Sequence, residues 1–273
     1  TALDLQPTDL SRLEGELAAA LAEIDALLPE AVRVAQILHL PAPQTFAEIR
    51  TLTAGLGSLA ARPAVAEVLI MLLFDHATQP RLQEGLAAGS AWAAAHAAAA
   101  TRFAAPAWTA NVMALRPALV RGQTSFLSRL FGGYRRASAE MASLMYGGLP
   151  KLPAERLALV DELATVQSLR QRLAVEEGWL QSVLGPEWRG ERTPFAEAEA
   201  VARWLTDVRR TGAFASAAQL VAALNALPDP RGNSSALTAR METCRDRLNA
   251  PLSRLRINLG QAGLGSDLDT ATL

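Results

Sequence analysis

Leucine, alanine and isoleucine recur at intervals of three and four residues in several long stretches of this chain, which is the spacing of an α-helix with one apolar face. In the first stretch, Thr8 or Asp9 is a suitable N-cap, and Pro29 marks the predicted end of the helix. A helix with such an apolar stripe is unstable alone in water, so a packing partner is expected. The apolar positions form a heptad seam with the spacing 3-4-3-4-3, made of Leu10, Leu13, Leu17, Ala20, Ile24 and Leu27.

Shorter and longer helices are predicted to follow as far as residue 146. The alanine-rich stretch after Pro80 is expected to be one long helix that Pro106 and Pro117 kink or divide, because proline lacks an N–H and collides with the preceding turn. Gly132 and Gly133 interrupt the next helix. The predicted ranges are 30–39, 45–61, 63–76, 81–115 and 124–146.

A second heptad-like seam begins after the clearest linker, Gly147–Pro150. The helix from Ala154 to Leu184 is expected to be about 45 Å long at 1.5 Å per residue. Gly185 and Pro186 end it. The seam consists of Leu159, Leu163, Val166, Arg170, Leu173, Glu177, Leu180 and Leu184.

The C-terminal part is predicted to contain two more helices and a third seam. Thr193 is the expected N-cap of a helix with Pro194 at its first position, and Gly212 closes that helix. A short helix is expected at 215–226. Pro251 should kink the third seam, which consists of Leu237, Met241, Cys244, Leu248, Leu252, Leu255 and Leu259.

These patterns predict an all-α protein. Long seams joined by short connectors favour an elongated helical bundle with long antiparallel coiled-coil-like hairpins. No repeat of fixed length is present, which argues against a solenoid. The predicted organisation is an N-terminal helical segment at 1–80, a long-helix region at 81–212, and a C-terminal helical segment at 213–273 that packs on the rest.

Composition supports the fold class, and the charge distribution adds information about partners. Half of the 273 residues are apolar, but only 5% are aromatic. The net charge is −1, so no global field attracts nucleic acid or membrane. The charge is nevertheless segregated: Thr1–Glu30 sums to −6, whereas Gly85–Ala139 contains no acid and sums to +6.

Few residues are suited to catalysis or metal binding, so no enzyme activity is expected of this chain. Lys151 is the only lysine and lacks the glycine spacing of a phosphate-binding loop. The three histidines are isolated, so no metal site is predicted. Cys244 is the only cysteine, and its place in the third seam favours core packing.

The sequence predicts no membrane span. No apolar run approaches the ~20 residues of a membrane-spanning helix. A single cysteine fits a cytoplasmic location.

The segment Ser125–Arg136 mixes arginines with aromatic residues inside the acid-free stretch. Arginine forms forked hydrogen bonds with phosphate, and aromatic rings stack on unpaired bases. The alternative interpretation is that the aromatic residues belong to the core and the arginines face water or the acidic first helix. The candidate nucleic-acid-binding residues are Arg116, Arg121, Arg129, Phe131, Tyr134, Arg135 and Arg136.

The segment Leu184–Phe195 is the second distinctive feature. Trp188 lies between two glycine turns, at Gly185 and Gly190, and precedes Thr193. The favoured interpretation of Trp188, Gly190 and Thr193 is a structural loop in which the tryptophan braces two helices where they separate.

The two segments together resemble the long helical region of large bacterial superfamily 1 helicases of the UPF1/Dna2-like kind, many of which also have a nuclease-like domain. The resemblance covers about 101–210. Phe195 stands where that family commonly has Trp, and the motor motifs are absent from this chain. The resembling pattern comprises Phe103, Trp108, Leu115-Arg116, Ser125–Phe131 and Tyr134–Ala137, then Leu184-Gly185, Trp188, Gly190, Thr193 and Phe195.

The resemblance implies a non-catalytic accessory region that contacts the DNA backbone or positions neighbouring domains. ATP and Mg²⁺ would belong to the parent helicase, and no cofactor is expected here. The alternative from the residues is a protein-interaction scaffold, whose seams dock on the parent protein, on a nuclease or on a second copy as a homodimer. No membrane partner is expected.

Overall fold

The computed structural model describes residues 7–64, 67–125, 127–130 and 132–227, with the single positions 239, 242, 243, 246, 253, 254 and 257. Apart from two isolated β-bridges, the regular elements of this part of the chain are all helices, which confirms the all-α fold class. The third predicted seam, Leu237 to Leu259, lies outside the described residues. None of the described helices is long and apolar enough to cross a membrane.

The chain divides into two compact units. Unit 1 comprises residues up to Thr78 and from Ala200 onward, and unit 2 comprises Gln79–Glu199. The elements of unit 1 are α1 (Pro7–Ile37), α2 (Phe46–Ala60), α3 (Glu67–Leu73), most of α8 (Phe195–Thr211) and α9 (Ala217–Ala226). Those of unit 2 are α4 (Pro80–Ala99), η1 (Ala105–Trp108), η2 (Val112–Ala114), α5 (Arg116–Thr124), η3 (Leu127–Leu130), α6 (Gly132–Ser143), α7 (Pro153–Leu184) and η4 (Gly185–Glu187).

Unit 1 corrects one predicted boundary. Pro29 does not end the first helix, because α1 continues through it to Ile37 and absorbs the separate helix predicted at 30–39. An interior proline costs about 3 kcal/mol of helix stability. Pro29 itself is exposed, but Leu27, Ala31 and Val34 before and after it are buried on the other face of the helix. Burial of that apolar face compensates for the missing backbone hydrogen bond.

Local interactions fix other parts of unit 1. Thr45 and Glu48 form a capping box at the start of α2, since the Thr45 hydroxyl accepts from the Glu48 N–H and the Glu48 carboxylate accepts from the Thr45 N–H. Gly212, with φ of 72°, follows α8, as expected of a left-handed C-terminal residue. Trp204 is buried and donates from Nε1 to the Ser58 carbonyl at 2.7 Å.

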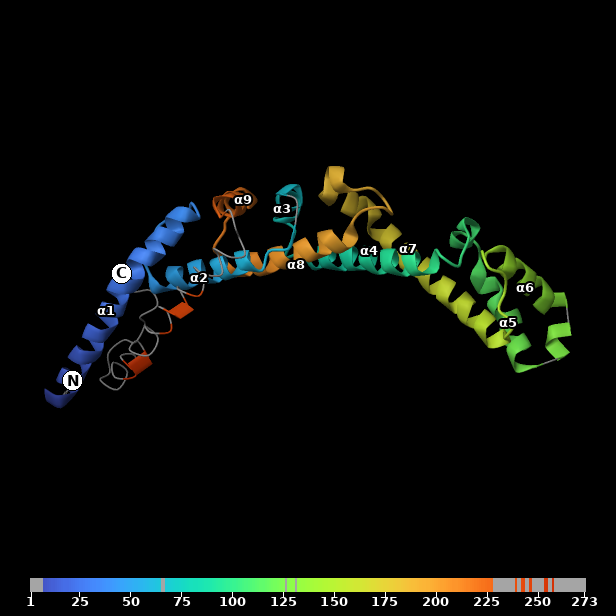
Figure 1. Ribbon diagram of the computed structural model, residues 1–273, viewed down its shortest axis with the longest axis horizontal. Coiled ribbons are helices and arrows are strands. Elements are labelled where there is room, and N and C mark those ends of the chain that lie inside the picture. The colour runs from blue at the N-terminus through green and yellow to red at the C-terminus, as the bar shows by residue number, and fades with distance from the viewer. Residues whose placement is uncertain are drawn as a thin grey trace. The chain divides into compact units, whose positions relative to one another are not determined.

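Unit 2 is built on the pair α4 and α7, which run side by side (Figure 1). Residues early in α4 meet residues late in α7: Gly85 packs against Leu180, and Arg81 forms an ion pair with Glu176. Just beyond the end of α4, Arg102 meets Glu162 in the first half of α7. The two helices are therefore antiparallel, and α5, η3 and α6 lie between them in sequence.

The single long helix predicted at 81–115 is divided. The helix α4 ends at Ala99, two 3-10 turns follow, and α5 begins at Arg116. Pro106 and Pro117 each occupy the first turn of a new element, where the absent N–H is harmless. Gly132 likewise begins α6 instead of interrupting a longer helix.

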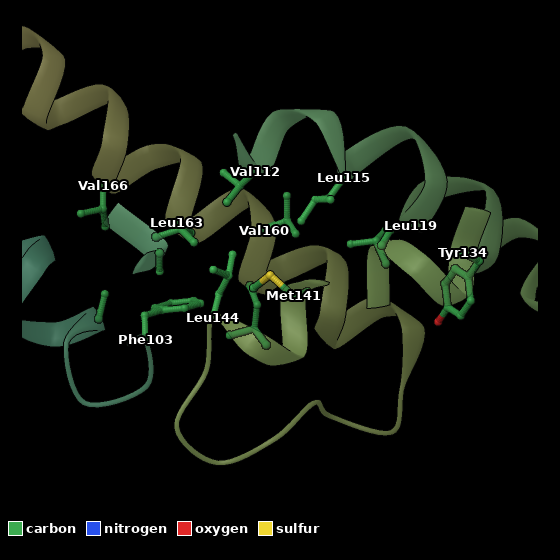
Figure 2. Close-up of a cluster of buried hydrophobic side chains, with 14 residues drawn as sticks. Phe103, Val112, Leu115, Leu119, Tyr134, Met141, Leu144, Val160, Leu163 and Val166 are labelled. Atoms are coloured by element: carbon green, nitrogen blue, oxygen red, sulfur yellow. The ribbon is translucent and has the colours of Figure 1, made fainter. Parts of the chain in front are cut away.

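The apolar core of one half of unit 2 gathers side chains from α5, α6, the start of α7 and the turns after α4 (Figure 2). Phe103 is 1% exposed and lies near the strand-like contact in which the Ala104 N–H donates to the Leu144 carbonyl. Met141, Val160 and Leu163 have no exposed surface. This core fixes the positions of the segments that surround the candidate site.

Candidate interaction groove

Two of the six arginines of the acid-free stretch are held by carboxylates of α7. Arg116 donates from Nε to Asp161 Oδ1 at 2.7 Å and from Nη2 to Oδ2 at 3.5 Å, and Arg102 pairs with the adjacent Glu162. The hydrogen bond and the charge of Asp161 raise the pKa of Arg116 above its ordinary value. Because arginine is already protonated near neutral pH, the raised pKa of Arg116 leaves the pH dependence of stability in that range unchanged.

The other four arginines differ in their exposure. Arg129 is half-buried and donates from Nε to the Gly122 carbonyl at 2.7 Å. Arg121, Arg135 and Arg136 are exposed and make no ion pair with any residue that the structure describes. They belong to α5 and α6, which pack on each other and on η3. We call these three elements the basic end, since residues 116–143 contain five arginines and a single carboxylate, Glu140.

Of the two aromatic candidates in this segment, the structure describes Tyr134 and not Phe131. Tyr134 is 8% exposed, and its ring fills the space beside Gly122, where a Cβ atom would overlap it. The Tyr134 hydroxyl accepts a hydrogen bond from Arg156 Nη1 at 3.1 Å. The ring is therefore a core side chain with no face for stacking on a base. Phe131 lies outside the described residues.

The loop after α7 has the architecture of a closed turn. Gly190 takes a φ of 59°, which favours glycine. Thr193 is 5% exposed, and its hydroxyl accepts from the Arg189 N–H at 2.9 Å and donates to the Gly190 carbonyl at 2.7 Å. The threonine side chain thus closes the loop across its base, a more local role than the predicted N-cap. Trp188 is half-buried and meets the buried Phe195 edge to face at 5.8 Å.

The 3-10 turns after α4 and the loop after α7 meet at a groove in unit 2. We call it the interaction groove. It has a main compartment of about 740 Å³ and a smaller one of about 190 Å³. Trp108 and Met113 contribute from the turns after α4, and Trp188 and Gly190 from the loop after α7, with α7 as the floor. Both compartments are bounded by Trp108, Thr109, Gln167, Arg170 and Glu191.

An ion pair and two hydrogen bonds fix the walls of the interaction groove. Arg170 of α7 donates from Nε to Glu191 Oε1 of the loop at 2.6 Å. The Gln167 side-chain amide donates to the carbonyls of Ala107 and Ala110, both at 2.8 Å. These bonds tie α7 to the loop on one side and to the 3-10 turns on the other.

A ladder of rings lines the smaller compartment. Trp92 stacks on His96 with centroids 5.1 Å apart, and His96 contacts Trp108 at 4.4 Å. Trp108 then meets the buried Phe103 edge to face at 6.3 Å. The ladder therefore connects the wall of the groove to the apolar core.

Sequence reasoning missed the groove, although one signal pointed to it. The α7 seam is apolar except at Arg170 and Glu177. Its apolar members, including Leu163 and Leu180, are buried within the chain, whereas both charged members are exposed and line the groove. The charged interruption of the seam marks the place where the floor helix opens to solvent.

No family model, curated protein or solved structure matches this chain. The resemblance to superfamily 1 helicases accordingly stays a prediction. Among the residues that the structure describes, no three His, Cys, Asp or Glu side chains come together in a way that could hold a metal ion.

Proposed function

We propose that this chain is a non-catalytic helical module that binds a peptide segment of a protein partner in the interaction groove. The observation on which this rests is the meeting of Trp108, Met113 and Trp188 around an open groove that polar side chains also line. Tryptophan and methionine are enriched in the buried centres of protein interfaces, and polar residues form the rim. The volume is sufficient for several side chains of a bound segment.

Three polar side chains of the groove are bonded within the fold, which supports a binding role over a catalytic one. Gln167 is committed to two backbone carbonyls, Arg170 to Glu191, and the Asn111 side chain to the Ala114 N–H. Groups that are already bonded within the fold hold its walls in place, whereas a general acid or base needs access to a substrate proton. We therefore assign no cofactor to this chain.

The proposal is tested with the full chain and a phage library of random 12-residue peptides. Ala174→Arg places a long side chain in the groove, and Val175→Arg is the matched control, because Val175 is the next residue of α7, is 78% exposed and does not line the groove. We expect peptides that bind the wild type and the Val175→Arg variant but not the Ala174→Arg variant. If no selected peptide distinguishes these two variants, the groove is not a recognition site.

A second candidate function is contact with the DNA backbone at the basic end. It is favoured by the exposure of Arg121, Arg135 and Arg136 in elements with one carboxylate. In this proposal the chain is an accessory region of a bacterial helicase-like protein that supplies ATP and Mg²⁺ chemistry elsewhere. Contacts of this kind are independent of base sequence and weaken as salt rises.

The DNA proposal is tested by titrating single- and double-stranded DNA at several salt concentrations. Replacing Arg121, Arg135 and Arg136 by Gln should reduce the slope of log affinity against log salt by about 2 to 3, since each phosphate contact contributes about 0.7 to 0.9. Equal slopes for the wild type and the triple variant would remove this candidate.

Self-association through coiled-coil-like hairpins is a third arrangement. The seam of α7 is largely covered within its own chain, so it offers little apolar surface to a second copy. Light scattering decides this point: we expect a monomer, and a dimer that persists at low concentration would favour the scaffold with paired hairpins.

A further inference from the structure

We infer that the partner segment recognised by the interaction groove is basic, and that an arginine or lysine side chain enters the groove beside Trp108 and Trp188. This inference rests on the proposed function and names the chemistry of its partner. Three features of the groove favour a cation: its balance of charge, its aromatic walls, and the end of a helix beside it.

The charges that line the main compartment sum to −1. Arg170 and Glu191 neutralise each other at 2.6 Å, which leaves Glu177. Glu177 is exposed and makes no ion pair with any described residue. A carboxylate on the floor of a groove attracts a cation and repels an acidic segment.

The aromatic walls of the groove also favour a cation. The face of an indole ring is electron-rich and attracts a guanidinium or ammonium group within about 6 Å, most strongly for tryptophan. Trp108 and Trp188 both line the main compartment, and both are only half-buried. Unit 2 already contains such a contact, since the Arg81 guanidinium lies 4.8 Å from the centre of the Trp179 ring.

The end of α4 adds a partial negative charge to the smaller compartment. Trp92 and His96 line this compartment, and α4 ends three residues after His96, at Ala99. The C-terminal end of a helix is the negative pole of its dipole and stabilises nearby cations. An anion in the smaller compartment would meet this pole and the carboxylate of Glu191, and the only arginine or lysine that lines this compartment is Arg170, which Glu191 already pairs.

The inference is tested on the full chain with three fluorescein-labelled 12-residue peptides. In these peptides leucine alternates with arginine, with citrulline or with glutamate. Citrulline keeps the shape of arginine without its charge. Fluorescence anisotropy should give about tenfold tighter binding for the arginine peptide than for the citrulline peptide, and the glutamate peptide should bind most weakly.

Two substitutions, each with a matched control, test whether the arginine peptide binds in the groove and contacts Glu177. Glu177→Gln should weaken binding of the arginine peptide about two- to fivefold, as expected for an exposed ion pair, and should leave binding of the citrulline peptide unchanged. Glu140→Gln is the matched control, because Glu140 is an exposed carboxylate on α6 in the same unit and does not line the groove. Ala174→Arg should abolish binding of the arginine peptide, and Val175→Arg should not.

The outcomes separate this inference from the proposed function. If groove-dependent library peptides are neutral or acidic, or the citrulline peptide binds as tightly as the arginine peptide, the groove binds a segment but the inference is wrong. Binding of the arginine peptide that survives Ala174→Arg also contradicts it, because the peptide then binds elsewhere. Absence of any groove-dependent peptide in the library overturns the proposed function itself.

Discussion

The segments Ser125–Arg136 and Leu184–Phe195 both combine arginine, aromatic residues and glycine, yet the fold uses them in different ways. In the first, Tyr134 is buried and Arg129 is bonded to a backbone carbonyl. In the second, Trp188 stays half-exposed on the wall of a groove. Tyr134 and Arg129 of the first segment therefore stabilise the interior, whereas Trp188 of the second forms part of a surface, and the difference depends on which elements pack against each residue.

The strongest test of this contrast is the replacement of Tyr134. Tyr134→Ala should reduce the free energy of unfolding by about 3 to 5 kcal/mol, because it empties a packed site in the core. Tyr134→Phe should cost about 1 kcal/mol, through loss of the hydrogen bond from Arg156. Urea unfolding measures both. A Tyr134→Ala variant of normal stability that no longer binds single-stranded DNA would instead identify the ring as a stacking surface.

Two helical glycines should respond in opposite directions to the same substitution. A Cβ atom at Gly89 would overlap the ring of Phe195, which is 1% exposed, so Gly89→Ala should destabilise the protein by about 1 to 3 kcal/mol. At Gly178 no atom lies within 4 Å of such a Cβ atom, and Gly178→Ala should stabilise α7 by about 1 kcal/mol. Thermal unfolding of the two variants measures the difference, and changes of equal sign would contradict the packing described for Gly89.

The stability of the closed turn beside Trp188 should depend on the hydroxyl group of Thr193. Thr193→Val keeps the shape of the side chain but leaves the Arg189 N–H without its acceptor, at a cost of about 1 to 2 kcal/mol. Hydrogen exchange at the Arg189 amide should become faster. Thr193→Ser retains the hydroxyl and is the control, so equal exchange in both variants would show that the loop is held in another way.

The smallest expected effect concerns the arginines of the first segment. Asp161→Asn combined with Glu162→Gln releases Arg116 and Arg102, so the double variant should elute from a heparin column at higher salt than the wild type. Glu140→Gln combined with Glu155→Gln changes the net charge equally without releasing an arginine, and its shift should be smaller. Equal shifts would mean that net charge alone determines retention.

Helix boundaries were predicted well from the sequence where nearby residues determine them. The boundaries of α7 were predicted at 154–184 and lie at 153–184, and α2 begins at Phe46, one residue beyond the predicted start at Thr45. Prediction was wrong where packing outweighed a local signal, as at Pro29. It was also wrong where a run of alanines hid the turn that begins after Ala99, because alanine favours a helix wherever no other residue decides the boundary.

The candidate site was less predictable. The ion-pair partners of Arg116 and Arg102 lie 45 and 60 residues further along the chain, so spacing within the acid-free stretch gave no indication of them. The groove likewise depends on the return of α7 past the turns after α4. Only the charged positions Arg170 and Glu177 in an otherwise apolar seam gave a local hint of its place.

The two hydrogen bonds of Gln167 have a consequence for the speed of recognition. Because its amide already holds the carbonyls of Ala107 and Ala110, the groove is preorganised before a partner arrives. A site that needs no rearrangement loses little conformational entropy on binding. Association should therefore proceed in one step, with a rate constant of about 10⁵ to 10⁷ M⁻¹s⁻¹ that does not saturate with peptide concentration.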